Sequence, residues 1–419
     1  MNKVLLLLLI IISNIAQADI YDDQLKLYIE RFNLKSLSKI SDANPRLTQL
    51  GKKLFEDKRL SLAGDISCKS CHNSHIGTGD GLPLSLGTGA VGEGHNRNIK
   101  EGNIIPRNAP SLYNKGRDEM GRMFWDGRIR KFPRDDYYTT PIEEFNGELG
   151  LENKIVQDLS GILAMQALFP MISKKEMLGE GYDHLSPFAI WNKITQKILS
   201  IDYYRIELES IFDFKDISIA HIANAIAHFQ KITFQATNTP YDEYLNGNKN
   251  ILSINEKKGF LVFAEKGRCI RCHFGPLLTN QSLQNVVVPS IGPGTDGRGN
   301  DRGHYDVNHN EKFKYRFVTS PLRNVKKTAP YFHNGSVLTL TDVVNHYNRP
   351  FNSIDEYDGR IIANKFIKNY GSAFRINRNP YTIFAIKENK SPLIKISLNL
   401  NPEEKRHLVL FLERSLTNR

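Results

Sequence analysis

The four cysteines of this chain occur in one short pattern that appears twice. Residues 68–72 have the sequence Cys-Lys-Ser-Cys-His, and residues 269–273 have the sequence Cys-Ile-Arg-Cys-His. In such a segment the two thiols can bond to the vinyl groups of a haem while the histidine binds its iron. A Cys-x-x-Cys pair alone is also typical of a redox dithiol or of half a zinc site. Because a histidine follows each pair and no cysteine lies elsewhere, we predict two covalently bound c-type haems. The attachment residues are Cys68, Cys71 and His72 for the first haem, and Cys269, Cys272 and His273 for the second.

The ligand on the other side of each iron decides whether a haem only transfers electrons or also binds a small oxidant. All six methionines precede Cys269, so the second haem must use a histidine, another side chain or no protein ligand on that side. The candidates after the second motif are His304, His309, His333, His346, His407 and several tyrosines. Near the first motif the candidates are His75 and His95. His75 is too close to His72 in sequence to reach the opposite face of the haem easily.

Helices are predicted to lead into both motifs. Residues 45–55 follow Asn44, a favourable N-cap, and begin with Pro45, which suits the first helical position. Residues 255–264 precede the second motif in the same way. A last helix after the N-cap Asn401 is expected to pack on this second leading helix. Residues 151–235 also show the apolar spacing of helices.

The predicted fold class is therefore mainly α, with two cytochrome c-like haem domains in tandem, long loops and little sheet. We expect an N-terminal domain over residues 19–240 and a C-terminal domain over residues 241–419. Proline, glycine and asparagine cluster between residues 238 and 248, which favours a break there. A short strand is predicted at residues 286–288, which are all valine.

The first 18 residues have the features of a cleaved secretory signal peptide. Lys3 precedes an apolar run over residues 4–12, and Ala16-Gln17-Ala18 matches a signal-peptidase site. The run is too short to span a bilayer, and no later stretch is long enough to do so. We therefore expect a periplasmic protein, in agreement with the attachment of c-type haems outside the cytoplasm.

The formal net charge of +11 would be reduced by the carboxylates of two haems. A basic surface can attract an acidic partner, but it can equally be a solvated surface of mixed charge. No basic run with interleaved aromatic residues suggests binding to nucleic acid.

The order of further motifs resembles that of the bacterial di-haem cytochrome c peroxidase and MauG family. These motifs are P-R-N-A-P at residues 106–110, F-W-D-G-R at 124–128, P-I-E at 141–143 and L-R-N-V-K-K-T-A-P-Y-F-H-N-G at 322–335. The resemblance extends from about residue 44 to the end of the chain. It implies that hydrogen peroxide reacts at the first haem and that the second haem relays electrons.

The resemblance also implies roles for single residues. Trp125, in F-W-D-G-R, would lie between the haems and relay electrons, and it would also suit a buried core position. Glu148 matches the family's acidic residue over the open haem. The spacing here is one residue longer than expected, so Glu143 and Glu144 are alternatives.

A calcium ion between the two domains is a further implication of the resemblance. Its ligands would be the side chain of Asn108 and the main-chain carbonyls of Thr328 and Pro330. Oxygen ligands suit this hard cation.

Two departures from the ordinary peroxidase pattern concern the iron ligands. Thr88 takes the place of a histidine that blocks the first haem in ordinary members, so that haem is expected to be open unless His95 reaches it. Tyr347 takes the place of the axial methionine of the second haem, as in MauG. The family's glutamine on the peroxide side has no clear match, and residues 135–138 occupy its region.

Three functions are compatible with these predictions. The first is reduction of hydrogen peroxide with electrons from a small cytochrome or cupredoxin. The second is a MauG-like maturation reaction, in which peroxide is used to oxidise tryptophan or tyrosine residues of a partner protein. The third is a di-haem electron carrier without catalysis, which requires two protein ligands on both irons.

Overall fold

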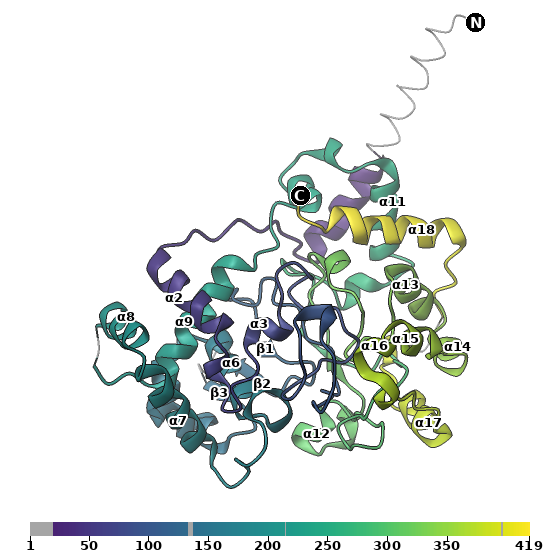
Figure 1. Ribbon diagram of the computed structural model, residues 1–419. Coiled ribbons are helices and arrows are strands. Elements are labelled where there is room, and N and C mark those ends of the chain that lie inside the picture. Colours follow the sequence, from purple (N-terminus) through teal and green to yellow (C-terminus); the bar gives the residue numbers. More distant parts are fainter. Residues whose placement is uncertain (1–19, 133–136, 214, 395–396) are drawn as a thin grey trace, which may run out of the picture.

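The computed structural model describes residues 20–132, 137–213, 215–394 and 397–419. The predicted signal peptide and residues 135 and 136 lie outside these ranges. The described part is mainly helical with two small sheets, which confirms the predicted fold class (Figure 1). No helix within the described ranges has the length and apolar character needed to cross a membrane.

The helices before the second motif are α2 (Pro45–Glu56), α3 (Cys68–Cys71), α4 (Gly147–Glu152), α5 (Lys154–Asp158), α6 (Ile162–Ile172), α7 (Pro187–Leu199), α8 (Asp202–Phe212), α9 (Ile219–Thr233), α10 (Pro240–Leu245) and α11 (Ile254–Ala264). Those after it are α12 (Tyr305–Asn308), α13 (Leu340–Asn348), α14 (Pro350–Asp355), α15 (Arg360–Lys365), α16 (Ile367–Tyr370), α17 (Pro380–Glu388) and α18 (Pro402–Leu410). The strands are β1 (Arg122–Met123), β2 (Ile129–Phe132), β3 (Tyr137–Thr139), β4 (Leu283–Gln284) and β5 (Phe317–Val318).

The first unit is built around the crossing of α2 and α9. Asn44 caps α2 as predicted, because its side chain accepts a hydrogen bond from the backbone of Leu47 at 3.0 Å. The two helices approach closely at Gly51, where an added Cβ would lie 1.9 Å from the carbonyl oxygen of Ala225. Buried residues of α6 and α7 extend the same core.

The second unit repeats this arrangement with α11 and α18. A Cβ on Gly259 would lie 2.0 Å from the carbonyl oxygen of His407. The rings of Phe260 and Phe411 stack with their centroids 4.8 Å apart. The prediction that the last helix packs on the leading helix is therefore confirmed (Figure 1). Each unit has a glycine where its two helices cross.

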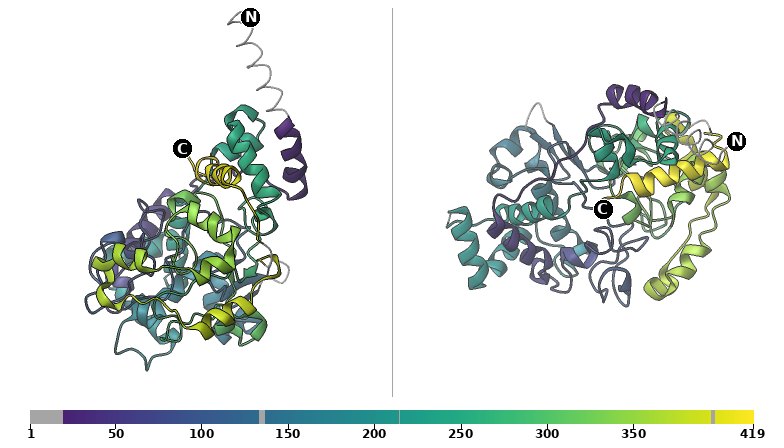
Figure 2. Two further views of the ribbon diagram at one scale, coloured as in Figure 1. Left: turned by 90° about the vertical axis from the view of Figure 1, so that its right-hand side faces the viewer. Right: turned by 90° about the horizontal axis from the view of Figure 1, so that it is seen from above.

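The first described residues pack with the second unit. Residues 20–31 are helical, and Leu25 and Leu34 belong to the second hydrophobic core. Asp22 is buried in an ion pair with Lys257 of α11 at 2.8 Å and accepts a hydrogen bond from the Tyr244 hydroxyl at 2.6 Å. Two views show this helix beside α11 (Figure 2). The division at residue 240 remains a prediction, and the structure adds that the first described segment packs with the second unit.

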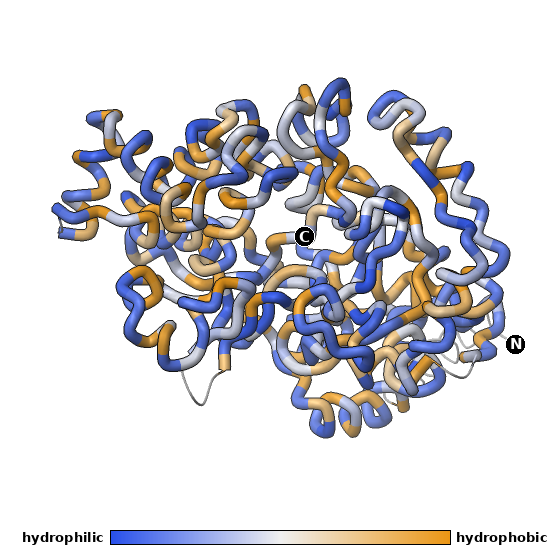
Figure 3. The backbone as a smooth tube through the Cα atoms, turned by 90° about the horizontal axis from the view of Figure 1, so that it is seen from below, coloured by the Kyte–Doolittle hydropathy of each residue, from blue (hydrophilic) through white to orange (hydrophobic). Residues whose placement is uncertain are grey.

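The two sheets are antiparallel and small, and they lie near the boundary of the two units. Strand order is β1-β2-β3 in one sheet and β4-β5 in the other. The predicted strand at residues 286–288 is wrong, because Val287 has a φ angle of 62°, which interrupts an extended chain. The tube coloured by hydropathy shows hydrophobic and hydrophilic residues alternating along most elements, as expected when each buries one face (Figure 3).

Candidate haem sites

Both motif histidines present the ring nitrogen that iron requires. The Nδ1 of His72 lies 2.9 Å from the carbonyl oxygen of Thr78, and the Nδ1 of His273 lies 3.0 Å from that of Leu278. A carbonyl can only accept, so Nδ1 carries the proton in each neutral ring, and Nε2 is the nitrogen that can bind a metal. Burial lowers the pKa of His72 and lowers that of His273 to about 4, so both rings are neutral near pH 7.

The motif thiols do not have the electrostatics of a redox dithiol. Burial raises the pKa of Cys68, Cys71 and Cys269 to about 12. A reactive dithiol needs a thiol with a lowered pKa. All four cysteines are free, and within the described ranges no group of three or more His, Cys, Asp and Glu residues is arranged to hold a metal ion. Covalent attachment to haem fits these buried thiols.

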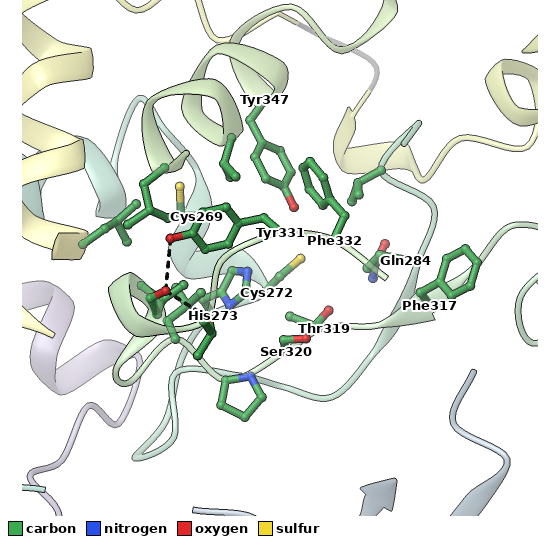
Figure 4. A pocket seen from close by; sticks show the side chains of 18 of the residues that line it. Cys269, Cys272, His273, Gln284, Phe317, Thr319, Ser320, Tyr331, Phe332 and Tyr347 are labelled. Atoms are coloured by element: carbon green, nitrogen blue, oxygen red, sulfur yellow. Dashed lines mark hydrogen bonds between the residues drawn. The ribbon is translucent and has the colours of Figure 1, made fainter. Parts of the chain in front are cut away.

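A large cavity adjoins the second motif (Figure 4). Cys269, Cys272 and His273 line it, and Tyr347 extends into it from α13 with its hydroxyl pointing inward. Burial raises the pKa of Tyr347. Within the part of the chain that the structure describes, its hydroxyl has no hydrogen-bond partner. A buried phenol without a partner that faces a motif histidine fits the predicted role of Tyr347 as an iron ligand.

The histidine alternatives to Tyr347 are less suited to bind iron. His346 has both ring nitrogens engaged, with Ser353 at 2.9 Å and the carbonyl of Val286 at 2.7 Å. His304, which bonds the carbonyl of Asp126 through Nδ1, does not line the cavity. His309 is exposed, and His407 lies 3.7 Å from Glu403. His333 lines the cavity, but its ring stacks on Phe317 with a centroid distance of 3.6 Å.

Trp125 lies at the boundary of the two units and lines the same cavity. Its indole nitrogen donates to the carbonyl of Asn108 at 2.9 Å. Its own carbonyl accepts from the backbone of Val318 in β5 at 2.7 Å. Trp125 therefore lines the same cavity as His273 and Tyr347, and its relay role remains a prediction.

A pair of buried salt bridges next to Trp125 joins the two units. Arg107 contacts Asp126 of the first unit at 2.5 Å and Asp301 of the second at 2.7 Å, and all three side chains are buried. Burial alone would raise the pKa of Asp126, but Arg128 and Arg107 lower it to about 2. Arg107 likewise holds the pKa of Asp301 below its usual range against burial. A buried charge with two partners fixes the geometry around Trp125.

The residues predicted to bind calcium all belong to the lining of this cavity. Asn108, Thr328 and Pro330 all line it. Among the described residues, no donor bonds the side-chain oxygen of Asn108 or the carbonyl oxygens of Thr328 and Pro330. Three oxygens without donors fit a hard cation.

The residues expected around the first haem are placed as follows. Thr88 is buried and its hydroxyl lies 3.2 Å from the amide nitrogen of Asn103, whereas His75 and His95 are exposed. Glu143, Glu144 and Glu148 are exposed as well. The structure does not bring these carboxyls into contact with the residues of the first motif.

Sequence reasoning missed Glu176, which lies closer to the first motif. It belongs to a π-helical turn, Lys174–Leu178, that packs on the loop of Thr88, where the Thr88 amide donates to the carbonyl of Lys175 at 3.2 Å. Burial raises the pKa of Glu176, and its charge in turn contributes to the raised pKa of the Cys71 thiol. No motif marks this glutamate in the sequence.

Comparison with protein families gives two matches. A family model described as di-haem cytochrome c peroxidase matches residues 45–250, and one described as RoxA-like, cytochrome c-like, matches residues 316–352. Together they include most of the first unit and the segment that leads to Tyr347.

Named relatives cover most of the chain. The cytochrome c551 peroxidase of Nitrosomonas europaea is 29% identical over 76% of this chain and 79% of its own length. That of Pseudomonas aeruginosa is 30% identical over 71% of this chain and 70% of its own length. The methylamine utilization protein MauG of Methylorubrum extorquens is 26% identical, with coverages of 74% and 70%.

Solved structures share the fold over nearly the whole chain. A MauG-like protein associated with microbial copper homeostasis superposes with a TM-score of 0.60 and 25% identity, covering 92% of this chain and 93% of that one. The diheme peroxidase BthA from Burkholderia thailandensis gives a TM-score of 0.59 at 19% identity, with coverages of 91% and 89%, which supports the fold.

Proposed function

Since this chain belongs to the di-haem cytochrome c peroxidase family and is a peroxidase-like oxidoreductase, we propose that hydrogen peroxide reacts at the first haem and that electrons are relayed through the second. When bound, the two haems supply the iron that exchanges electrons and binds the oxidant. The observation that supports this most is the difference between the two sites. The hydroxyl of Tyr347 faces His273, whereas His75 and His95 near the first motif are exposed.

In this proposal each residue of the two sites has a separate role. His72 and His273 would hold the irons through Nε2, and the Tyr347 hydroxyl would be a second ligand of the iron held by His273. A negatively charged phenolate there stabilises the oxidised state of that haem. Trp125 carries electrons between the sites. Glu148 moves a proton between the two peroxide oxygens, as a general acid–base does.

Asn108, Thr328 and Pro330 are proposed to hold one calcium ion at the unit boundary, next to Trp125. Removal of calcium with a chelator is expected to slow electron exchange between the haems, and readdition is expected to restore it.

The protein is proposed to be located in the periplasm, with cleavage of the signal peptide before Asp19. Protein sequencing of the mature N-terminus tests that assignment.

A second candidate function is the oxidation of tryptophan or tyrosine residues in a partner protein. Support comes from Tyr347 inside the cavity, from Thr88 in place of a histidine, and from the MauG-like structure with 25% identity. In this case the partner protein replaces the small cytochrome or cupredoxin as electron source.

One experiment separates these functions. The purified di-haem protein is mixed with stoichiometric hydrogen peroxide, with and without a reduced small cytochrome or cupredoxin, and followed by stopped-flow absorption. Rapid return to the resting state only with the donor is expected for a peroxidase. An oxidised state that persists for minutes and resists the donor supports the maturation reaction instead. No reaction with peroxide, together with two purely low-spin ferric haems in the EPR spectrum, overturns both and leaves the electron carrier.

A further inference from the structure

The cavity at the second motif has an unbalanced charge. Its walls include three cationic side chains, Lys115, Arg268 and Arg323, and no aspartate or glutamate from the described ranges. Buried cations in proteins are normally paired with an anion. The cavity is therefore suited to an anionic group.

Among the described residues, hydrogen-bond partners are found for only one of the three cationic groups, the guanidinium of Arg323. Arg323 is 1% exposed and bonds the carboxylate of Asp242 at 2.6 Å and the carbonyl of Pro276 at 2.7 Å. Arg268 directly precedes Cys269, so it would lie near the vinyl edge of a haem bonded to that cysteine. The propionates of a haem lie on the opposite edge of the ring.

Lys115 differs from Arg323 in its lack of a partner and from Arg268 in its origin. It comes from the first unit, as do Asn108 and Trp125, which line the same cavity. Among the residues described, no hydrogen bond or ion pair is found for its ammonium group. Burial without a partner lowers the pKa of Lys115 to about 8.

We propose that Lys115 binds a propionate of the haem attached at Cys269 and Cys272, and thereby positions and tunes that haem from across the unit boundary. The ammonium group donates hydrogen bonds to the carboxylate, and the pair neutralises two charges that would otherwise be buried alone. A cation next to the haem edge disfavours the more positive, oxidised iron and raises the reduction potential. The assignment takes from the proposed function only the second haem, not the reaction with peroxide.

The test is a spectroelectrochemical titration of the holoprotein with Lys115→Met, Lys115→Arg and the control Lys326→Met. Lys326 is exposed and lies between two residues that line the cavity, Val325 and Thr328. We expect Lys115→Met to lower the potential of the second haem and leave that of the first unchanged. Lys115→Arg should restore most of the difference, and Lys326→Met should behave like the unmodified protein. Resonance Raman spectra should show a shifted propionate bending band in Lys115→Met.

The proposal is overturned if Lys115→Met leaves both the potential and the propionate band of the second haem unchanged. Equal shifts of the two haems also contradict it, since they indicate a general structural effect. If the methionine variant does not fold, Lys115→Gln keeps a polar side chain of similar length and gives the same comparison. Normal potentials combined with a lost peroxide reaction would count against the proposed function and not against this role of Lys115.

Discussion

Tyr347 and Tyr331 line the same cavity but use their hydroxyls differently. The Tyr331 hydroxyl donates to the carbonyl of Val325 at 3.2 Å, whereas that of Tyr347 points into the cavity without a described partner. Two tyrosines at one site therefore offer a matched pair for mutation.

Replacement of Tyr347 by Phe is expected to change the absorption and EPR spectra of the second haem and to raise its reduction potential, because the phenolate ligand is lost. Tyr331→Phe keeps the same ring and should leave both spectra as they are. Ligation by Tyr347 is ruled out if the two variants give identical spectra of the second haem.

The proton-transfer carboxyl can be identified by a second pair of variants. Glu148→Gln is expected to slow the reaction with peroxide about 100-fold, a usual effect of losing a general acid–base. Glu176→Gln tests the buried carboxyl near Cys71, and its rate should stay within a few-fold of the original. Stopped-flow rates decide between them, and the reverse order would assign the role to Glu176.

At the scale of elements, both units repeat one helix crossing with a glycine at the contact. The carbonyl of Ala225 meets Gly51 in α2, and the carbonyl of His407 meets Gly259 in α11. Neither carbonyl can move without shifting its helix, so an added methyl group must push the helices apart.

We expect Gly51→Ala and Gly259→Ala each to destabilise the protein by about 2 kcal/mol, since overpacking outweighs the gain in helix propensity. Denaturant unfolding followed at each haem gives the measurement. Gly51→Ala should loosen the first haem site and Gly259→Ala the second, so each variant is the control for the other. Equal effects at both haems would show that the crossings are not independent.

The helices that could be predicted from the sequence are those stabilised by bonds between residues close together in the chain. Asn44 and Asn401 cap α2 and α18 through side-chain bonds to residues three positions away, and such bonds depend only on neighbouring residues. The haem motifs are equally local. Val287 was mispredicted because its backbone angle follows a bond to Asn285 rather than its strand propensity.

At the scale of the whole molecule, segments far apart in the sequence pack together. The first described helix packs with the second unit, and Arg107 bridges to Asp301 across 194 positions. Contacts of this separation leave no periodic pattern in a sequence, so the sequence alone does not predict them. The position of Glu176 beside the first motif has the same kind of cause.

Loss of the buried pair between Asp22 and Lys257 should destabilise the second unit. Asp22→Ala leaves the ammonium group of Lys257 buried and unpaired, which is expected to cost about 3–5 kcal/mol. Denaturant unfolding should show the loss chiefly at the second haem. Asp23→Ala, at the exposed neighbouring position, should have little effect, and equal losses in both variants would contradict the role of the pair.

The helix over residues 20–31 is synthesised long before the residues of α11 with which it packs. Asp22 and Lys257 are 235 positions apart, so at a rate of about 5–20 residues per second the lysine is made roughly 10–50 s after the aspartate. Throughout that interval the helix over residues 20–31 lacks its partner helix α11. The helices α2 to α9 and the first haem motif are therefore synthesised before Lys257 is available to Asp22.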